Sequence, residues 1–410
     1  MNPRSKKTLL LLFKVIVLLL IVEYVRRQIQ LDDELAVASS ATGAEIALSA
    51  PDGRPVRVVP GSRLKVSESP GSAPATAEGP GAYLAVTPTG ERVRIALSDV
   101  EGPKASFELL PGMRTLLRQL DFSVLGWALV AFGPAIFLMA VRWQTLLVMS
   151  EVRIPFWIVV RLHYMGLFFN MFMPGGLGGD VIKAVYVSGH SPRRAEAATM
   201  VLIDRVIGLV GLLLMAGTVI LLDYRHLGGI ALQVGAISLL LTVGSLLFFS
   251  ARFRALVRYD WVLGKLPKAD VLRRIDTVLY DLRRQWRGLA IALALTVVLQ
   301  VVEVVGVLLA GRALGIYRAT LQNYLVFVPL GYLANALPIS LGGIGVMEGA
   351  FMTLLRDSGL ATASQGFMLG VLARLLVIAW SVPGALSALW PPPRTVEDAP
   401  DRAQKERRAG

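Results

Sequence analysis

Several ionisable residues lie within or next to long apolar stretches of this sequence, where a charge requires an explanation, and seven of them are candidates for function. They are Asp180, Lys183, Asp204, Arg205, Glu303, Glu348 and Arg374. An ionisable side chain in the middle of a membrane-spanning helix costs about 2.5–3.5 kcal/mol on insertion scales, so it needs a partner or a role. An arginine such as Arg205 offers a planar fork of donors that suits a lipid phosphate. Asp180 and Glu348 would attract an amino headgroup or relay protons, and tight structural ion pairs are the alternative explanation.

The spacing of these residues indicates which of them share a partner. Asp180 and Lys183 are three residues apart, which places them on one face of a helix. Asp204 and Arg205 are adjacent and point about 100° apart on a helix, so we expect them to have different partners. Glu303 and Arg374 lie deep within apolar segments, which favours a polar cavity around them.

A repeated motif is the strongest feature of the sequence. Pro-x-x-Leu-Gly-Gly occurs at 174–179 and again at 338–343, with Asn170 and Asn335 shortly before the two prolines. Proline removes a backbone donor, and a glycine pair permits close approach and positive φ, so each motif predicts a break in a helix. Freed amides at a helix N-terminus can hold an anion such as a phosphate headgroup. The alternative is that the glycine pairs only allow tight helix packing.

The elements that must position these residues are apolar helices. The sequence is 54% hydrophobic and only 17% charged, which is typical of a membrane protein. We expect an all-α polytopic membrane domain over residues 121–390. Its apolar segments lie at 122–141, 156–173, 199–222, 229–250, 288–311, 321–337, 345–355 and 366–390. The second and sixth of these end at the Pro/Gly motifs, which predicts broken or re-entrant hairpins there.

Charge predicts the orientation of these segments. Residues 251–287 contain ten Lys or Arg against four acids, so we expect this stretch in the cytoplasm, together with the basic tail 391–410, which we expect to be disordered. Residues 1–27 combine a basic start with an apolar run and show no small-residue cleavage site, so they predict an uncleaved membrane anchor. Both termini can be cytoplasmic only if each hairpin returns to the side that it entered. The two halves would then form an inverted repeat with a substrate site at their interface.

Residues 28–120 differ from the rest in composition. Two passages, starting at Ile46 and Tyr83, alternate apolar and polar residues on either side of a Pro-x-Gly turn, which predicts β-hairpins. We therefore expect a small β-rich module outside the membrane, on the extracytoplasmic side.

The ordered set of motifs resembles the transmembrane region of the lysylphosphatidylglycerol synthase/flippase family. The resemblance is carried by residues 142–143, 166–170, 174–183, 204–208 and 335–349, and it covers about 112–390. It implies a lipid-translocating membrane domain. Full synthases carry a large soluble aminoacyl-transfer domain after the membrane part, whereas this chain ends soon after its last apolar segment. We therefore expect a stand-alone member that does not transfer lysine from aminoacyl-tRNA.

The leading functional hypothesis is a flippase or transporter in the cell inner membrane, and not an enzyme. Its partners would be membrane lipids, namely anionic or amino-phospholipids or polyprenyl-linked groups. We expect no nucleic acid, because the basic residues cluster between apolar segments, and no cofactor or metal, because no ligand spacing occurs. The alternative is a membrane-embedded transferase for a lipid-linked substrate, and a third possibility is a scaffold whose β module binds a partner. The predicted substrate-binding residues are Asn170, Pro174, Gly178, Gly179, Asp180, Lys183, Asp204, Arg205, Glu303, Asn335, Pro338, Gly342, Gly343, Glu348 and Arg374.

Overall fold

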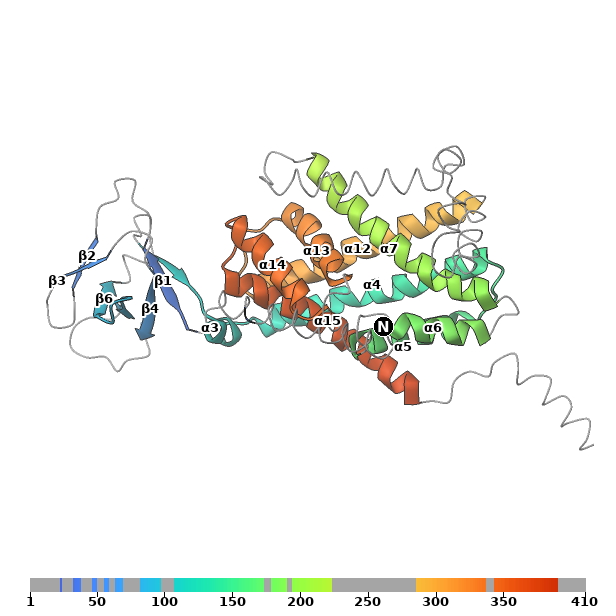
Figure 1. Ribbon diagram of the computed structural model, residues 1–410, viewed down its shortest axis with the longest axis horizontal. Coiled ribbons are helices and arrows are strands. Elements are labelled where there is room, and N and C mark those ends of the chain that lie inside the picture. The colour runs from blue at the N-terminus through green and yellow to red at the C-terminus, as the bar shows by residue number, and fades with distance from the viewer. Residues whose placement is uncertain are drawn as a thin grey trace, which may run out of the picture.

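The structure is a computed structural model with two parts, a β-sheet and a helical bundle (Figure 1). It describes residues 23, 32–37, 46–49, 55–58, 63–68, 82–96, 107–172, 178–189, 194–222, 285–336 and 343–389. Several expectations lie outside these residues: most of the N-terminal anchor, the apolar segment 229–250, most of the basic stretch 251–287, and the tail 391–410. The same holds for the residues between the helices at each motif, 173–177 and 337–342.

The sheet has seven antiparallel strands in the order β3-β2-β6-β5-β4-β1-β7. The strands are β1 (Glu34–Val37), β2 (Ile46–Ser49), β3 (Pro55–Val58), β4 (Arg63–Glu68), β5 (Ala82–Val86), β6 (Arg92–Ala96) and β7 (Phe107–Leu110). Both predicted hairpins are confirmed, since β2 pairs with β3 and β5 pairs with β6. Alternate residues of these strands, among them Leu35, Leu64 and Ile95, form a small buried core.

A short helix, α3 (Met113–Arg118), connects the sheet to the bundle. Asp33, just before β1, accepts a hydrogen bond of 2.8 Å from the backbone amide of Gly112. At the other side of the connection, Leu116 and Leu120 are buried in the main apolar cluster of the bundle. The β module is therefore attached to the membrane part by a packed joint.

The bundle contains eight helices in the part of the chain that the structure describes. They are α4 (Phe122–Met149), α5 (Phe156–Phe172), α6 (Gly178–Gly189), α7 (Arg194–Leu222), α12 (Trp286–Ala313), α13 (Leu321–Ala336), α14 (Val346–Asp357) and α15 (Ala363–Leu389). Four of them, α4, α7, α12 and α15, are long and apolar enough to cross a membrane. Large apolar side chains such as Trp127, Val298 and Leu386 are exposed on their outer faces, as expected for helices in contact with lipid. The chain is therefore an integral, multi-pass membrane protein.

The helix order repeats within the bundle. Helices of 28, 17, 12 and 29 residues (α4 to α7) are followed by helices of 28, 16, 12 and 27 residues (α12 to α15). In each set the Pro/Gly motif begins between the second and third helix, since α5 ends at Phe172 and α13 at Ala336. The two sets are not separate bodies. Helix α4 packs against α12, α5 against α15, and α13 against α7.

The first helices of the two sets are antiparallel. The backbone amide of Asp121, at the start of α4, donates to the carbonyl of Ala313, at the end of α12, over 3.1 Å. At the opposite end, the Gln285 side chain before α12 donates to the carbonyl of Met149 in α4 over 2.8 Å. In the middle, Gly306 of α12 lies close against Phe132 of α4, so the absence of a side chain permits this approach.

Candidate functional site

The first motif brings two helices together without side chains between them. A Cβ on Gly179 would overlap the carbonyl oxygen of Gly166 in α5, so only glycine fits. The backbone amide of Gly179, at the start of α6, donates to the side-chain oxygen of Asn170 over 2.8 Å. This amide would otherwise have no helical partner, because the first turn of a helix leaves its donors unpaired. Asn170 therefore fixes the start of α6 against the end of α5.

The third residue of α6, Asp180, forms an ion pair with Arg205 of the long helix α7. The guanidinium of Arg205 in α7 donates to the carboxylate of Asp180 over 2.5 Å. The side chains of Arg205 and Asp180 are 29% and 23% exposed. The pair is thus partly accessible.

The second motif has a matching but tighter arrangement. The third residue of α14, Glu348, receives hydrogen bonds of 2.5 and 3.2 Å from Arg374 of α15. Arg374 also donates to the carbonyl of Gly343 over 2.9 Å and to the side chain of Asn335 over 3.3 Å. Glu348 additionally accepts from the backbone amide of Gly345 over 2.7 Å, which caps α14. Gly343 has a φ of +72°, a conformation that favours glycine.

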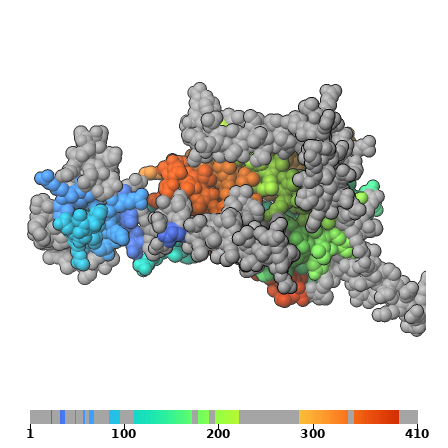
Figure 2. Space-filling model, in the orientation of Figure 1, coloured from blue at the N-terminus to red at the C-terminus, as the bar shows by residue number. Residues whose placement is uncertain are grey.

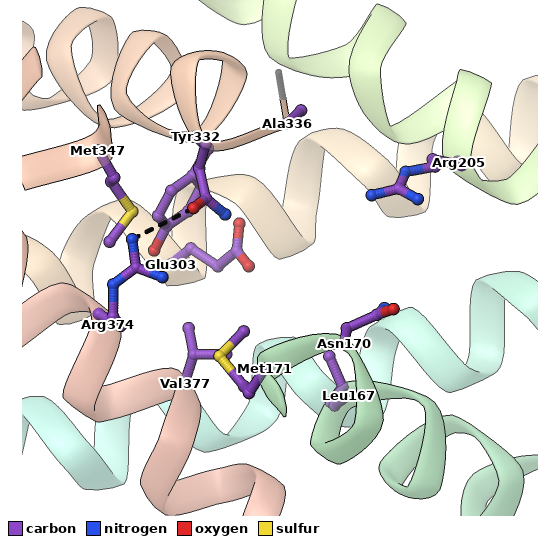
Figure 3. A pocket seen from close by; sticks show the side chains of 11 residues that line it. Leu167, Asn170, Met171, Arg205, Glu303, Tyr332, Ala336, Met347, Arg374 and Val377 are labelled. Atoms are coloured by element: carbon purple, nitrogen blue, oxygen red, sulfur yellow. Dashed lines mark hydrogen bonds between the residues drawn. The ribbon is translucent and has the colours of Figure 1, made fainter. Parts of the chain in front are cut away.

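The two arginines line one cavity of about 210 Å³ (Figure 3). It lies between helices of both sets, because Asn170 and Met171 come from α5, Arg205 from α7, and Asn335 from α13. The residues that line it are Leu167, Asn170, Met171, Arg205, Glu303, Tyr332, Asn335, Ala336, Met347, Arg374 and Val377. Five of the predicted site residues therefore meet here: Asn170, Arg205, Glu303, Asn335 and Arg374.

Glu303 is the carboxylate that faces this cavity from α12. Figure 3 shows its side chain extending into the space between Arg374 and Arg205. Glu303 is only 5% exposed, and no residue in the described part of the chain forms a hydrogen bond or ion pair with it. The hydroxyl of Tyr332, on the same cavity, is likewise buried with no hydrogen-bond partner among the described residues.

Four further predicted residues contact the cavity residues without lining the cavity, and one of them is Gly179, whose amide donates to Asn170. Asp180 and Glu348 hold the two arginines, and Gly343 offers its carbonyl to Arg374. Gly178 and Gly179 are buried at the start of α6. Pro174, Pro338 and Gly342 lie outside the described residues.

Asp204 and Lys183 lie away from the cavity. Asp204 pairs with Arg142 over 2.8 Å in a buried contact that also includes Thr296. As predicted, adjacent Asp204 and Arg205 thus have different partners. Lys183 is buried against Trp143, with its ammonium nitrogen 3.0 Å from Nδ1 of His163. Asp180 and Lys183, although three residues apart on one helix, therefore belong to different environments.

Sequence reasoning did not single out Tyr332 or the apolar lining residues Leu167, Met171, Ala336, Met347 and Val377. The sequence positions of two of them gave a weak indication that they line the site. Met171 immediately follows Asn170, and Ala336 immediately follows Asn335, at the ends of the two interrupted helices. Proximity to the motif asparagines would have identified these two. Leu167, Met347 and Val377 are ordinary apolar residues of membrane helices, and nothing in their type distinguishes them.

The arrangement is suited to binding an anionic group. Two guanidinium groups face a small space that is also lined by polar and apolar side chains, and a guanidinium binds phosphate or carboxylate oxygens in pairs. In the described ranges, no group of three or more His, Cys, Asp or Glu is placed to hold a metal ion.

A known protein family matches the part of the sequence that forms these helices. No curated protein matches the chain significantly. The family model described as "Lysylphosphatidylglycerol synthase TM region" matches residues 109–384, which is more than half of the 410-residue sequence. The match includes every helix that contributes to the cavity and begins at the last strand of the β module. The chain therefore belongs to the lysylphosphatidylglycerol synthase transmembrane-region family.

Proposed function

We propose that this protein is a flippase that moves the charged, phosphate-bearing headgroup of a lipid across the membrane through the cavity between its two helix sets. The observation that carries this proposal is the position of the two arginines. Arg205 lies eleven residues after Arg194, the first residue of α7, and Arg374 lies eleven residues after Ala363, the first residue of α15. Both line the same cavity, and each pairs with the third residue of a short helix.

The chemistry of the cavity supports a phosphate-bearing substrate. A headgroup phosphate can replace a carboxylate on a guanidinium, because both offer two oxygens in a similar geometry. Asp180 and Glu348 would hold the arginines while the cavity is empty of lipid. The pair with Asp180 is the more accessible, so we infer that Arg205 meets the headgroup first.

An inverted repeat would let one cavity serve both leaflets. The repeated helix lengths, the antiparallel packing of α4 and α12, and the cross-set pairs α5–α15 and α13–α7 support two halves of opposite orientation. In this arrangement α5–α6 and α13–α14 are broken hairpins that enter from opposite sides. Each hairpin would open and close the path to one leaflet in turn.

The basic segments support a placement in the inner, or plasma, membrane with both termini in the cytoplasm. The β module would then lie on the opposite side.

Lipid translocation in proteoliposomes tests the function. The vesicles would contain phosphatidylglycerol with a fluorescent tail, and a membrane-impermeant quencher would report the labelled lipid in the outer leaflet. We expect the purified protein to speed the exchange between leaflets, and Asp180→Asn and Arg205→Ala to abolish this effect while still inserting. Arg318→Ala removes an exposed arginine and serves as the matched control. Normal transport by both Asp180→Asn and Arg205→Ala would contradict the assigned site, and protein-free rates for the native chain would contradict the function.

The transferase alternative predicts a different result in the same vesicles. Mass spectrometry of the lipids after incubation with a donor would reveal a new product if the protein were an enzyme. We propose that it is not, so we expect the lipid composition to remain unchanged while the leaflets exchange.

A further inference from the structure

We propose that Glu303 is a proton-binding site that couples proton movement to headgroup transport, and this inference rests on the proposed function. The carboxylate would take up a proton from water on one side of the membrane and release it on the other. The anionic headgroup and the proton would then cross in the same direction.

The position of Glu303 distinguishes it from the other carboxylates of the site. Asp180 and Glu348 each accept hydrogen bonds from an arginine, and Asp204 pairs with Arg142. Glu303 is 5% exposed, close to Glu348 at 4% and Asp204 at 7%, and the described residues offer it no hydrogen bond. Its side chain points into the cavity instead (Figure 3). A carboxylate without a hydrogen-bond partner at membrane depth is costly when it is charged, and a bound proton removes that charge. The surroundings of Glu303 therefore control how readily it binds a proton.

The charged groups around Glu303 come from every helix packed against α12. Helix α4 contributes Arg142, which is bound to Asp204 of α7, and α7 also contributes Arg205. Helix α13 contributes Tyr332, and α15 contributes Arg374 with its partner Glu348. Both cavity arginines, Arg205 and Arg374, therefore line the same space as Glu303.

Binding of a headgroup would bring a second negative charge close to Glu303. A phosphate between the arginines takes over their charge and repels a second anion a few ångströms away, which favours the protonated form of Glu303. By thermodynamic reciprocity, protonation of Glu303 must then strengthen headgroup binding by the same factor. Anion and proton therefore bind together and leave together, which is the requirement for coupled transport.

A pH gradient across proteoliposomes tests the coupling. The vesicles would contain phosphatidylglycerol and the fluorescent-tail lipid, with a pH-sensitive dye trapped inside. We expect a gradient to accelerate translocation by the native protein toward the alkaline side, together with acidification of that side. Glu303→Gln, which removes the ionisable proton at nearly constant shape, should lose the acceleration and the acidification. Glu151→Gln changes an exposed carboxylate outside the cavity and should keep both.

Infrared spectroscopy provides a measurement that does not depend on transport. The native protein should show the band of a protonated carboxyl group that titrates with pH, and Glu303→Gln should lack it. Glu303→Asp, which keeps a carboxyl group, should retain a titrating band and shows whether loss in the glutamine variant reflects misfolding.

The outcomes separate the two proposals. Unchanged gradient dependence in Glu303→Gln, or acceleration by a sodium gradient at constant pH with none by a pH gradient, overturns the role of Glu303. Absence of any translocation by the native protein overturns the proposed function alone, since the infrared band still reports whether Glu303 binds a proton. Absence of a titrating band in the native protein overturns the proton site.

Discussion

The two helix sets contain the same parts but hold their central ion pairs differently. In the first set, Arg205 and Asp180 are 29% and 23% exposed and are joined by a contact of 2.5 Å. In the second set, Arg374 and Glu348 are 12% and 5% exposed, and Arg374 also binds Gly343 and Asn335. Burial decides how much such a pair contributes to the free energy of unfolding. Water screens the charges of an exposed pair, whereas a buried charge that has lost its partner is not solvated by water. The second pair should therefore maintain the fold, and the first should be available for the substrate.

Figure 2 shows the same helical body in space-filling form beside the sheet. The helices of the two sets occupy one continuous mass, in agreement with the cross-set packing of α5 with α15 and α13 with α7. A change in one set must therefore be accommodated by the other. Substitutions in either set can test how far the two ion pairs differ.

Loss of the buried arginine should have the largest effect. Arg374→Ala leaves Glu348 buried without its partner, and breaking a buried pair in this way costs about 3–5 kcal/mol. We expect this decrease in the free energy of unfolding, measured by denaturant titration in detergent. Replacing both residues, as in Arg374→Met with Glu348→Met, should recover much of the loss, and a double variant as unstable as Arg374→Ala would contradict the explanation.

Alanine at the motif glycines should have the next largest effect. Gly179→Ala places a Cβ against the backbone carbonyl of Gly166, which cannot move aside, whereas Gly343→Ala meets chiefly the Asn335 side chain. Overpacking of this kind costs about 1–3 kcal/mol, and alanine at the positive φ of Gly343 adds strain. We expect Gly179→Ala to lower the thermal unfolding temperature at least as much as Gly343→Ala.

The matched control for both is Gly349→Ala in α14, where an added Cβ meets no atom within 4 Å. This variant should be as stable as the native protein or slightly more stable, since alanine favours a helix by about 1 kcal/mol over glycine. If all three variants behaved alike, the close approach at the motifs would not matter for stability.

Loss of the more exposed arginine should affect stability little and transport strongly. Arg205→Ala should cost no more than about 1 kcal/mol, because partly exposed ion pairs contribute about 0–1 kcal/mol. Its unfolding curve in detergent should nearly coincide with that of the native protein, while lipid exchange in vesicles is lost. A destabilisation equal to that of Arg374→Ala would remove the distinction between the two sets.

The smallest effect is expected at Lys183, a predicted site residue that lies outside the cavity. Lys183→Met keeps the length of a side chain that packs on Trp143 and Gly166 and removes a buried charge. We expect a change in stability within about 1 kcal/mol and an unchanged rate of lipid exchange. A loss of exchange in this variant would show that the site extends beyond the cavity to α6.

Most of the architecture was predictable from local patterns. Long apolar segments predicted the membrane helices, the Pro/Gly motifs predicted that α5 and α13 end where they do, and two Pro-x-Gly turns predicted the hairpins β2–β3 and β5–β6. These features depend on interactions between residues that are close in sequence. The order of the seven strands was not predictable, because β1 lies between β4 and β7, which come much later in the chain.

The amino-acid sequence by itself determined which residues of this protein are costly in a membrane and where its helices must break. Residue type fixes the free energy of placing a charge in lipid, and proline and glycine act on the backbone at their own positions. Only the tertiary structure decided the partners: Asp180 with Arg205, Glu348 with Arg374, Asp204 with Arg142, and Glu303 facing the cavity. Each pairing joins residues from different helices, and which faces of those helices meet depends on the packing of the whole bundle.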